Sequence, residues 1–256
     1  MRRKGIMGIA ALVLMLMTVI APVQAHVPAG AGEAPEGEIG EIVMFDAGGG
    51  LLRISIDDAA EAHGDLCVCT ACAFRVTQAA ISQLYNLEEE LPTQGELKVT
   101  YHHPGKGHKD VMEYLLTPAC VTYEKVGNPK HLTLEHYTYQ FTRTDTGDTF
   151  ETQVKEGVIP EDFPDLRYKV EGFKNGWHED KPTEAEKAAF AERWTEARDN
   201  FLTMELGELF EGMESEEEEE GGFPMAGVVF TGVVIRGTDR RAGIFSGREK
   251  GVISQW

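Results

Sequence analysis

Apolar side chains recur every three or four residues in three segments of the chain. The first segment, residues 72–87, predicts an amphipathic helix that starts at or within a cluster of cysteines. The second, residues 108–117, has the same spacing. The third lies within residues 182–210, where Thr183 and Glu186 have the types and spacing of a capping box at a helix start. Three amphipathic helices are therefore expected.

Other segments alternate apolar and polar residues, which is the pattern of half-buried strands. The expected strands are one near Ile54 and four at residues 96–103, 119–126, 136–144 and 149–156. Residues 158–182 are interrupted by Pro and Gly, and we interpret them as an irregular connection. The order of the elements predicts an α+β fold with an α-β-α-β-β-β core, a mixed sheet and a C-terminal amphipathic helix.

The first 25 residues have the pattern of a secretory signal peptide. Basic residues precede an apolar stretch, and Val23 and Ala25 stand at the −3 and −1 positions of a small-residue cleavage site. We predict cleavage after Ala25 and an exported protein, in the periplasm or another extracytoplasmic compartment. A membrane anchor is the alternative, but the apolar stretch is near the lower limit of about 18 to 20 residues for a spanning helix. We therefore expect no stable membrane span after cleavage.

Composition divides the remaining chain into four parts. Residues 26–45 are expected to form a flexible N-terminus rich in Pro, Gly, Ala and Glu, and residues 46–211 the metal-binding domain argued below. Residues 212–222 are expected to form an acidic linker, and residues 223–256 a Gly-rich tail of unknown role.

The chain is strongly acidic. Its formal net charge is −19, and the predicted leader holds three of the 24 Lys and Arg but none of the 43 Asp and Glu, so the exported chain has a net charge of −22. Such a surface repels nucleic acid, and no nucleic-acid partner is expected. The expected partner is a metal ion, with a homodimer or a partner in a redox complex as further alternatives.

One histidine and three cysteines lie within ten residues, at His63, Cys67, Cys69 and Cys72. Covalent haem attachment needs the pattern C-x-x-C-H, but Ala73 follows the last cysteine. A thiol redox pair of Cys69 and Cys72 stays an alternative, because C-x-x-C at a helix start favours a thiolate. In an oxidising compartment, the same two thiols can also form a local disulfide.

A metal site accounts for more of these residues. Side chains three or four residues apart lie on the same side of a helical turn, as His63 and Cys67 do, and Cys69 and Cys72. Thiolate and imidazole ligands suit zinc, with iron, nickel or copper(I) as alternatives. Further candidate ligands are the remote Cys120 and the histidines around the H-P-G-K-G-H turn, His102, His103 and His108.

Two motifs resemble those of the FmdE family, whose name comes from a component of formylmethanofuran dehydrogenase. The stretch HGDLCVCTACAFRVTQAAISQL is similar to the family's H-G-H-x-C-P-G opening and the helix after it, and TPACVTYEKVGNP is similar to its G-C-T-x-G-K-G-N segment. YTYQFTRTDTGDTFETQV resembles the hairpin that follows, so the resemblance covers about residues 54–211. It implies an α-β-α-β(3) core.

The resemblance also implies a bound metal, commonly zinc, held by His63, Cys67 and Cys120. The chain departs from the family pattern, because the second His of the first motif is Asp65 and its Pro-Gly is Val68-Cys69. Asp65, Cys69 or Cys72 would then modify the set of ligands.

The sequence thus predicts an exported metal-binding protein with a thiolate and imidazole site, and two alternatives stay open. The first is a metal-dependent enzyme with an open coordination position beside His102 and His103, or an accessory component of an exported redox system. The second is a thiol–disulfide redox protein that uses Cys69 and Cys72. The family name by itself transfers no activity to this chain, because function depends on the site and not on the fold.

Overall fold

The computed structural model describes residues 27–35 and 39–213. The predicted signal peptide and its cleavage site, most of the predicted acidic linker and the Gly-rich tail lie outside the described residues. None of the helices in the described part is long and apolar enough to cross a membrane.

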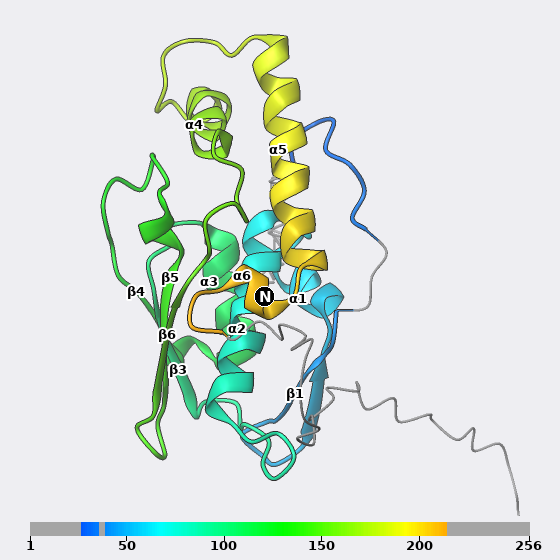
Figure 1. The fold of residues 1–256 in the computed structure, drawn as a ribbon, viewed down its shortest axis with the longest axis vertical. Helices are drawn as coiled ribbons and strands as arrows, with labels where there is room; N and C mark the ends of the chain where they lie inside the picture. The colour runs from blue at the N-terminus through cyan, green and yellow to red at the C-terminus, as the bar shows by residue number, and fades with distance from the viewer. Residues whose placement is uncertain (1–26, 36–38, 214–256) are drawn as a thin grey trace, which may run out of the picture. The chain divides into compact units, whose positions relative to one another are not determined.

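A four-stranded mixed sheet forms one layer of the fold, with the strand order β4-β3-β5-β6 (Figure 1). Its strands are β3 (Leu97–Tyr101), β4 (Val121–Tyr123), β5 (Thr138–Arg143) and β6 (Thr149–Gln153). Strand β4 runs parallel to β3, whereas β3 with β5 and β5 with β6 are antiparallel. Apolar side chains alternate along β3, so that Leu97, Val99 and Tyr101 are buried on the face that the helices cover.

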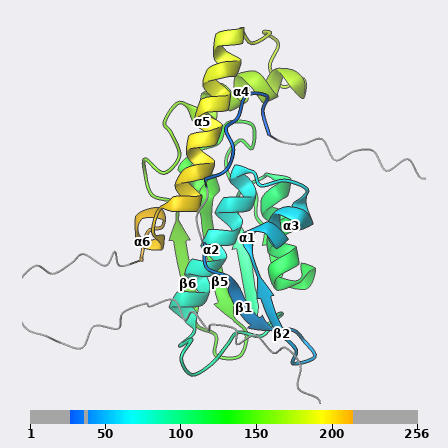
Figure 2. The ribbon, with the colours of Figure 1, turned by 90° about the vertical axis from the view of Figure 1, so that its right-hand side faces the viewer.

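Helix α2 (Val68–Leu84) lies between this sheet and the other helices. It packs against α1 (Ile56–His63), α3 (Lys106–Leu116) and α5 (Glu184–Thr203), and also contacts β5 and β6. Most of its residues are buried, since neighbours surround it on nearly every side. Helices α4 (Phe163–Lys174) and α5 extend past one end of the sheet (Figure 2).

The remaining elements are short. Strands β1 (Ile42–Phe45) and β2 (Leu51–Ile54) form a separate antiparallel hairpin. Two short 3-10 helices, η1 (Pro118–Cys120) and η2 (Leu134–Tyr137), precede β4 and β5, and α6 (Leu206–Leu209) follows α5. The α+β class, the mixed sheet and the order of the core elements are confirmed.

Two segments differ from the sequence prediction. Residues 42–45 were expected in a flexible N-terminus, but they form β1, because Ile42 and Met44 alternate into the core. Residues 158–182 were expected to be irregular, but they contain α4. Its proline, Pro164, lies in the first turn, where no intrahelical N–H is needed. Its glycine, Gly172, lies where a Cβ atom would come within 3.1 Å of His178 Cβ.

Arg143 connects the sheet to the end of α2. Its guanidinium donates to the carbonyl of Leu84 at 2.9 Å, pairs with Glu90 and Asp145, and lies 4.0 Å from the centre of the Tyr85 ring. The hydrogen bond from Arg143 lowers the pKa of Asp145 to about 2. The guanidinium thus stabilises a carbonyl at the C-terminus of the helix that carries the cysteines.

Replacing this cation should destabilise the fold. We expect Arg143→Leu to lower the free energy of unfolding by about 2 to 4 kcal/mol, because several charge-assisted hydrogen bonds are lost together. Urea denaturation measures this change. The control is Arg53→Leu, since Arg53 forms an exposed pair with Glu41 and such pairs contribute about 0 to 1 kcal/mol. If both variants lost the same free energy of unfolding, Arg143 would stabilise the fold no more than an exposed ion pair does.

Candidate metal centre

The candidate site lies where the start of α2, the chain after β3 and the start of α3 meet. Helix α1 ends at His63, and Gly64 follows with a left-handed backbone (φ 107°), which only glycine adopts without strain. The chain therefore turns sharply and brings Cys67 to the N-cap of α2. After β3, residues 102–105 lead directly into α3.

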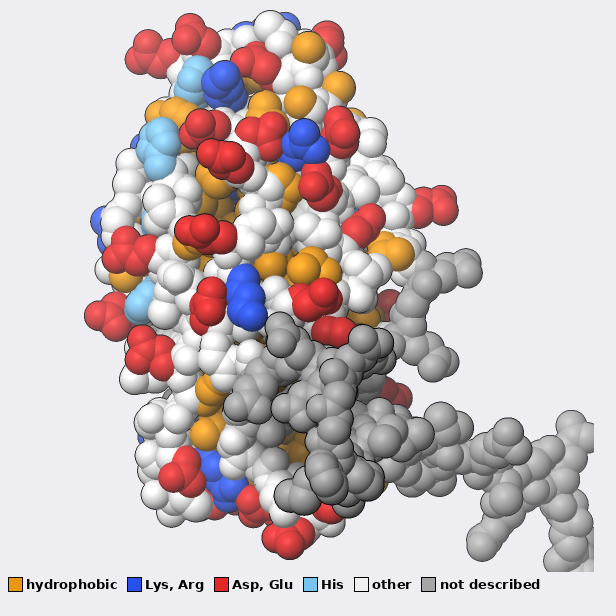
Figure 3. Space-filling view, in the orientation of Figure 1, with side chains coloured by type: hydrophobic (Ala, Val, Ile, Leu, Met, Phe, Trp, Pro, Cys, Tyr) orange, Lys and Arg blue, Asp and Glu red, His pale blue; other side chains and the backbone are white. Residues whose placement is uncertain are grey.

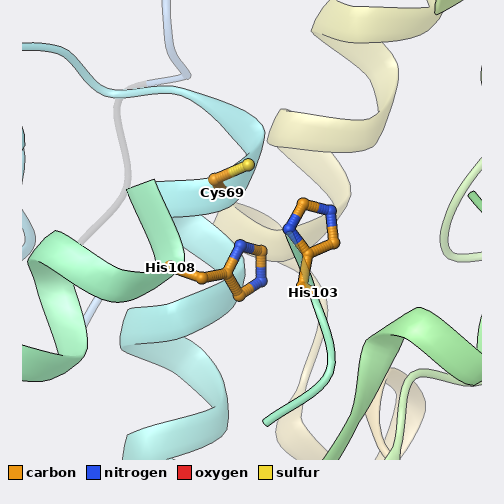
Figure 4. A group of neighbouring side chains, drawn as sticks. All are labelled: Cys69, His103 and His108. Carbon is orange, nitrogen blue, oxygen red and sulfur yellow. The ribbon is translucent and has the colours of Figure 1, made fainter. Parts of the chain in front are cut away.

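Cys69, His103 and His108 form the first group of potential ligands (Figure 4). Their ligand atoms all lie within 4.8 Å of one another, and the two imidazole rings stack with centres 4.0 Å apart. Ligand atoms around a tetrahedral zinc ion, at bond lengths of about 2.0 to 2.3 Å, lie about 3.3 to 3.8 Å apart. Side-chain shifts of about 1 Å would therefore bring this group to coordination distances.

The environment of His108 leaves one ring nitrogen without a protein partner. Its Nε2 hydrogen-bonds with the hydroxyl of Tyr139 at 2.8 Å, and that hydroxyl also lies 3.2 Å from Cys72 Sγ. Its Nδ1 is buried and has no hydrogen-bond partner in the part of the chain that the structure describes. Burial lowers the pKa of His108 to about 3, so the ring is neutral at pH 7. With the proton on Nε2, Nδ1 presents a lone pair towards Cys69, and a metal ion would satisfy it.

His103 is likewise held as a neutral ring. It is 2 % exposed, and its Nδ1 accepts the N–H of Gly105 at 3.0 Å. Burial holds the pKa of His103 well below its ordinary value, and electrostatic interactions with His108 and Arg167 lower it further. Neutral imidazole is the form that binds metals, and coordination through Nδ1 of His103 would replace its hydrogen bond from Gly105.

His63, Asp65 and Cys67 form the second group, and their ligand atoms also lie within 4.8 Å of one another. Nδ1 of His63 donates to the carboxylate of Asp110 at 2.8 Å. A carboxylate that fixes one ring nitrogen is the usual partner of a metal-binding histidine, because it directs the other nitrogen to the ion. The hydrogen bond with Cys67 raises the pKa of His63 to about 9, although burial opposes this shift, so a metal ion at this ring would displace a proton.

Cys67 lies at the start of α2, where its surroundings favour the ionised thiol. Hydrogen bonds from Cys69, His63 and Thr70 hold the pKa of the Cys67 thiol well below its ordinary value. Cys69 keeps its proton, since the hydrogen bond to Cys67 and burial raise the pKa of Cys69. The contact between the two sulfur atoms joins the two groups of ligands into one continuous cluster.

A glycine loop covers this cluster. A Cβ atom on Gly105 would lie 2.9 Å from Cys69 Sγ and 2.7 Å from the His103 ring. On Gly107 it would lie 2.8 Å from Cys69 Cβ and 3.1 Å from Nε2 of His63. The P-G-K-G segment, which the sequence shows only as a turn, thus lets the backbone approach the cluster where a side chain would collide.

A comparison with protein families identifies the family of the chain. The family model described as "FmdE, Molybdenum formylmethanofuran dehydrogenase operon" matches residues 62–211, which is more than half of the chain and includes every residue of both groups. The chain belongs to the FmdE family. No curated protein and no solved structure matches the chain.

The FmdE domain does not bring Cys120 to the cluster, although the sequence resemblance implies this residue as a ligand. Val121 pairs with Val99 in the parallel β3 and β4, so Cys120 lies beside Lys98. His103 is five residues further along the chain, about 16 Å away at about 3.3 Å per residue. The thiol of Cys120 instead donates to the carbonyl of Gly95 at 3.3 Å.

Two other predicted metal ligands, His102 and Cys72, also lie outside the cluster in the FmdE domain. His102 lies outside both groups, and its Nε2 is 3.8 Å from a carboxylate oxygen of Glu124. Cys72 is fully buried against Tyr139, and burial raises the pKa of its thiol to about 12. Both Cys69 and Cys72 are free thiols, so the structure has no local disulfide between them. Cys72 therefore supports His108 through Tyr139 and does not itself reach the cluster.

Gly107 lies so close to Cys69 that a larger residue at position 107 should disturb the candidate metal site. In Gly107→Ala, the added methyl group would collide with Cys69 Cβ, which no side-chain rotation can move away. We expect the metal affinity to fall by at least about 10-fold, as it does when a residue that orients a metal ligand is lost. Competition with a chromogenic chelator measures this affinity, and circular dichroism shows whether the protein is folded. Gly40→Ala is the control, since its nearest contact would be 4.0 Å away. Unchanged affinity in Gly107→Ala would contradict the assignment.

Proposed function

We propose that this FmdE domain binds a transition-metal ion, with zinc as the first choice, in an exported protein. The ligands are drawn from His63, Cys67, Cys69, His103 and His108, and Asp65 lies close enough to adjust the set. The observation that carries the proposal is the buried Nδ1 of His108, which has no partner within residues 27–35 and 39–213 and faces a thiol and a second imidazole. Such an atom is costly to bury unless something binds it.

The chemistry of the ligands supports a soft or borderline ion. Thiolate and neutral imidazole suit zinc, iron, nickel and copper(I), whereas calcium and magnesium require mostly oxygen ligands. Among these ions zinc most often takes mixed cysteine and histidine sets.

The number of ligands favours an ion that exchanges partners. A closed structural zinc site uses four protein ligands. This cluster offers five thiol and imidazole groups in two adjacent sets, which the contact between Cys67 and Cys69 connects. The ion can therefore change ligands as it is taken up or passed on, which supports a role in metal binding and delivery.

A metal-dependent enzyme is the second candidate. The observation that favours it is a cavity lined by His63, Cys67, Cys69 and His103, which gives a substrate access to the ion. A redox pair of Cys69 and Cys72 receives less support, because Cys72 is fully buried and its thiol pKa is raised by that burial.

Metal analysis of the exported protein tests the proposal. The full chain is expressed with its leader, purified from the extracytoplasmic fraction and analysed by inductively coupled plasma mass spectrometry. We expect about one zinc ion per chain. Cys67→Ser and His108→Gln should abolish tight binding, and Asp110→Asn should weaken it about 10- to 100-fold, because Asp110 only orients His63.

Cys120→Ser provides the matched control, since it makes the same chemical change at a thiol outside the cluster. It should retain zinc with unchanged affinity. Loss of zinc in Cys120→Ser alone would instead favour the ligand set that the family resemblance implies. Metal-free wild-type protein with a reversible Cys69–Cys72 disulfide would overturn the proposal, and recovery of the protein only from the cytoplasm would overturn its exported location.

A further inference from the structure

A cavity of about 730 Å³ lies between the metal centre and helices α4 and α5. His63, Cys67, Cys69 and His103 line one side, and Arg167, Trp177 and Trp194 line the other. Pockets for small organic molecules typically have volumes of about 300 to 1,000 Å³, far more than a bare ion requires. The cavity therefore has room for an organic molecule next to the ion.

Arg167 on α4 is the main polar feature of the second side. Its Nε pairs with Glu171 at 3.1 Å, and the guanidinium carbon lies 5.6 Å from the centre of the Trp177 ring. Its Nη1 is buried and has no hydrogen-bond acceptor among the described residues. A buried guanidinium nitrogen without an acceptor is unfavourable, so the arrangement suits an anionic ligand that supplies one.

The charge of the cavity lining is opposite to that of the chain. Acidic residues outnumber basic ones by 43 to 24 in the sequence, and acidic side chains are spread over the face seen in Figure 3. The lining instead contains four basic side chains and two acidic ones. They are Lys106, Arg167, Lys174, Lys187, Glu171 and Glu184. Asp110 pairs with Lys106, Glu184 with Lys187 and Glu171 with Arg167, so the excess of positive charge is small, but it still favours anions over cations.

The rest of the lining is largely aromatic and aliphatic. Phe163, Phe190 and Trp194 are buried side chains of α4 and α5 that border the cavity, and Trp177 follows α4. An apolar wall with a few placed polar groups is typical of sites for small organic ligands. The ligand should therefore have an apolar body as well as its anionic group.

We propose that this cavity binds a small organic carboxylate, with its carboxylate on Arg167 and its apolar body against Trp177 and Trp194, next to the metal centre. A carboxylate fits better than a phosphate dianion, because Glu171 already occupies Nε of Arg167 and its negative charge would repel a doubly charged group. This inference rests on the proposed function, since the metal centre forms one side of the site.

The test uses the zinc-loaded full chain and three carboxylate probes, 4-phenylbutyrate, benzoate and succinate. Isothermal titration calorimetry measures their binding, with 4-phenylbutyramide as the neutral counterpart of the first. We expect 4-phenylbutyrate to bind with a Kd below about 1 mM and the amide at least about 10-fold more weakly. Succinate, which lacks an apolar body, should bind more weakly than 4-phenylbutyrate.

Variants then locate the binding site. Arg167→Gln should weaken 4-phenylbutyrate binding by at least about 10-fold, and Arg167→Lys should recover part of the loss, because lysine keeps the charge without the planar fork. Arg193→Gln is the control, since Arg193 lies on the same pair of helices but pairs with Asp162 and Glu196 outside the cavity. Thermal melting identifies any variant that is not folded.

The zinc content of every sample separates this inference from the proposed function. Retained zinc with weakened probe binding in Arg167→Gln supports both. Retained zinc in the wild type with no saturable binding of any carboxylate up to about 10 mM, a free energy near −3 kcal/mol, overturns the inference alone. So does equal binding of the acid and the amide, or equal binding to wild type and Arg167→Gln. Absence of zinc from the wild type overturns the proposed function.

Discussion

The arrangement of the site depends on the buried N-terminus of helix α2. Because α2 is surrounded by other elements, the N–H groups of its first turn must find acceptors inside the protein. Cys67 is the N-cap, and its sulfur accepts the N–H of Thr70 at 3.4 Å. A neutral thiol is a weak acceptor, whereas a thiolate at a helix N-terminus is favoured by the helix dipole. The same sulfur atom therefore caps the helix and is available as a candidate metal ligand.

The neighbours of Cys67 follow from this constraint. A buried thiolate needs a compensating partner, and His63 provides it while Asp110 holds the imidazole in place. The left-handed Gly64 allows α1 to end directly beside the start of α2, so the two side chains can meet. On the other side, Gly105 and Gly107 let the start of α3 approach Cys69 and bring His108 to the cluster.

The sequence predicts the order of the core elements because their hydrophobic periods are clear. It also predicts part of the cluster, since His63, Cys67 and Cys69 are close along the chain. It singles out His108 only as one of three histidines near a turn. The decisive property of that residue is the unpaired Nδ1, which arises from the hydrogen bond between Nε2 and Tyr139, 31 residues away. Only the tertiary structure reveals this pairing.

Cys120 and α4 show why the remaining features could not be predicted. Strand β4 was expected, but the direction in which it pairs with β3 decides which end of the sheet carries Cys120, and single-strand patterns do not contain this information. In the segment that forms α4, the proline and glycine residues favour an irregular connection on sequence grounds. Both are compatible with a helix here, because Pro164 occupies the first turn and Gly172 admits a close contact with His178. Without α4, the cavity wall that contains Arg167 could not be foreseen.

Close packing and open space lie side by side at the candidate metal centre. On the side of the glycine loop, the backbone approaches so closely that a Cβ atom would collide with Cys69. On the side of α4 and α5, a large cavity lies next to the same cluster and contains a guanidinium nitrogen that lacks an acceptor among the described residues. A metal that served only to stabilise the fold would gain from closed packing on both sides. The cavity, which the glycine loop borders together with α4 and α5, therefore favours an ion that meets a second molecule there.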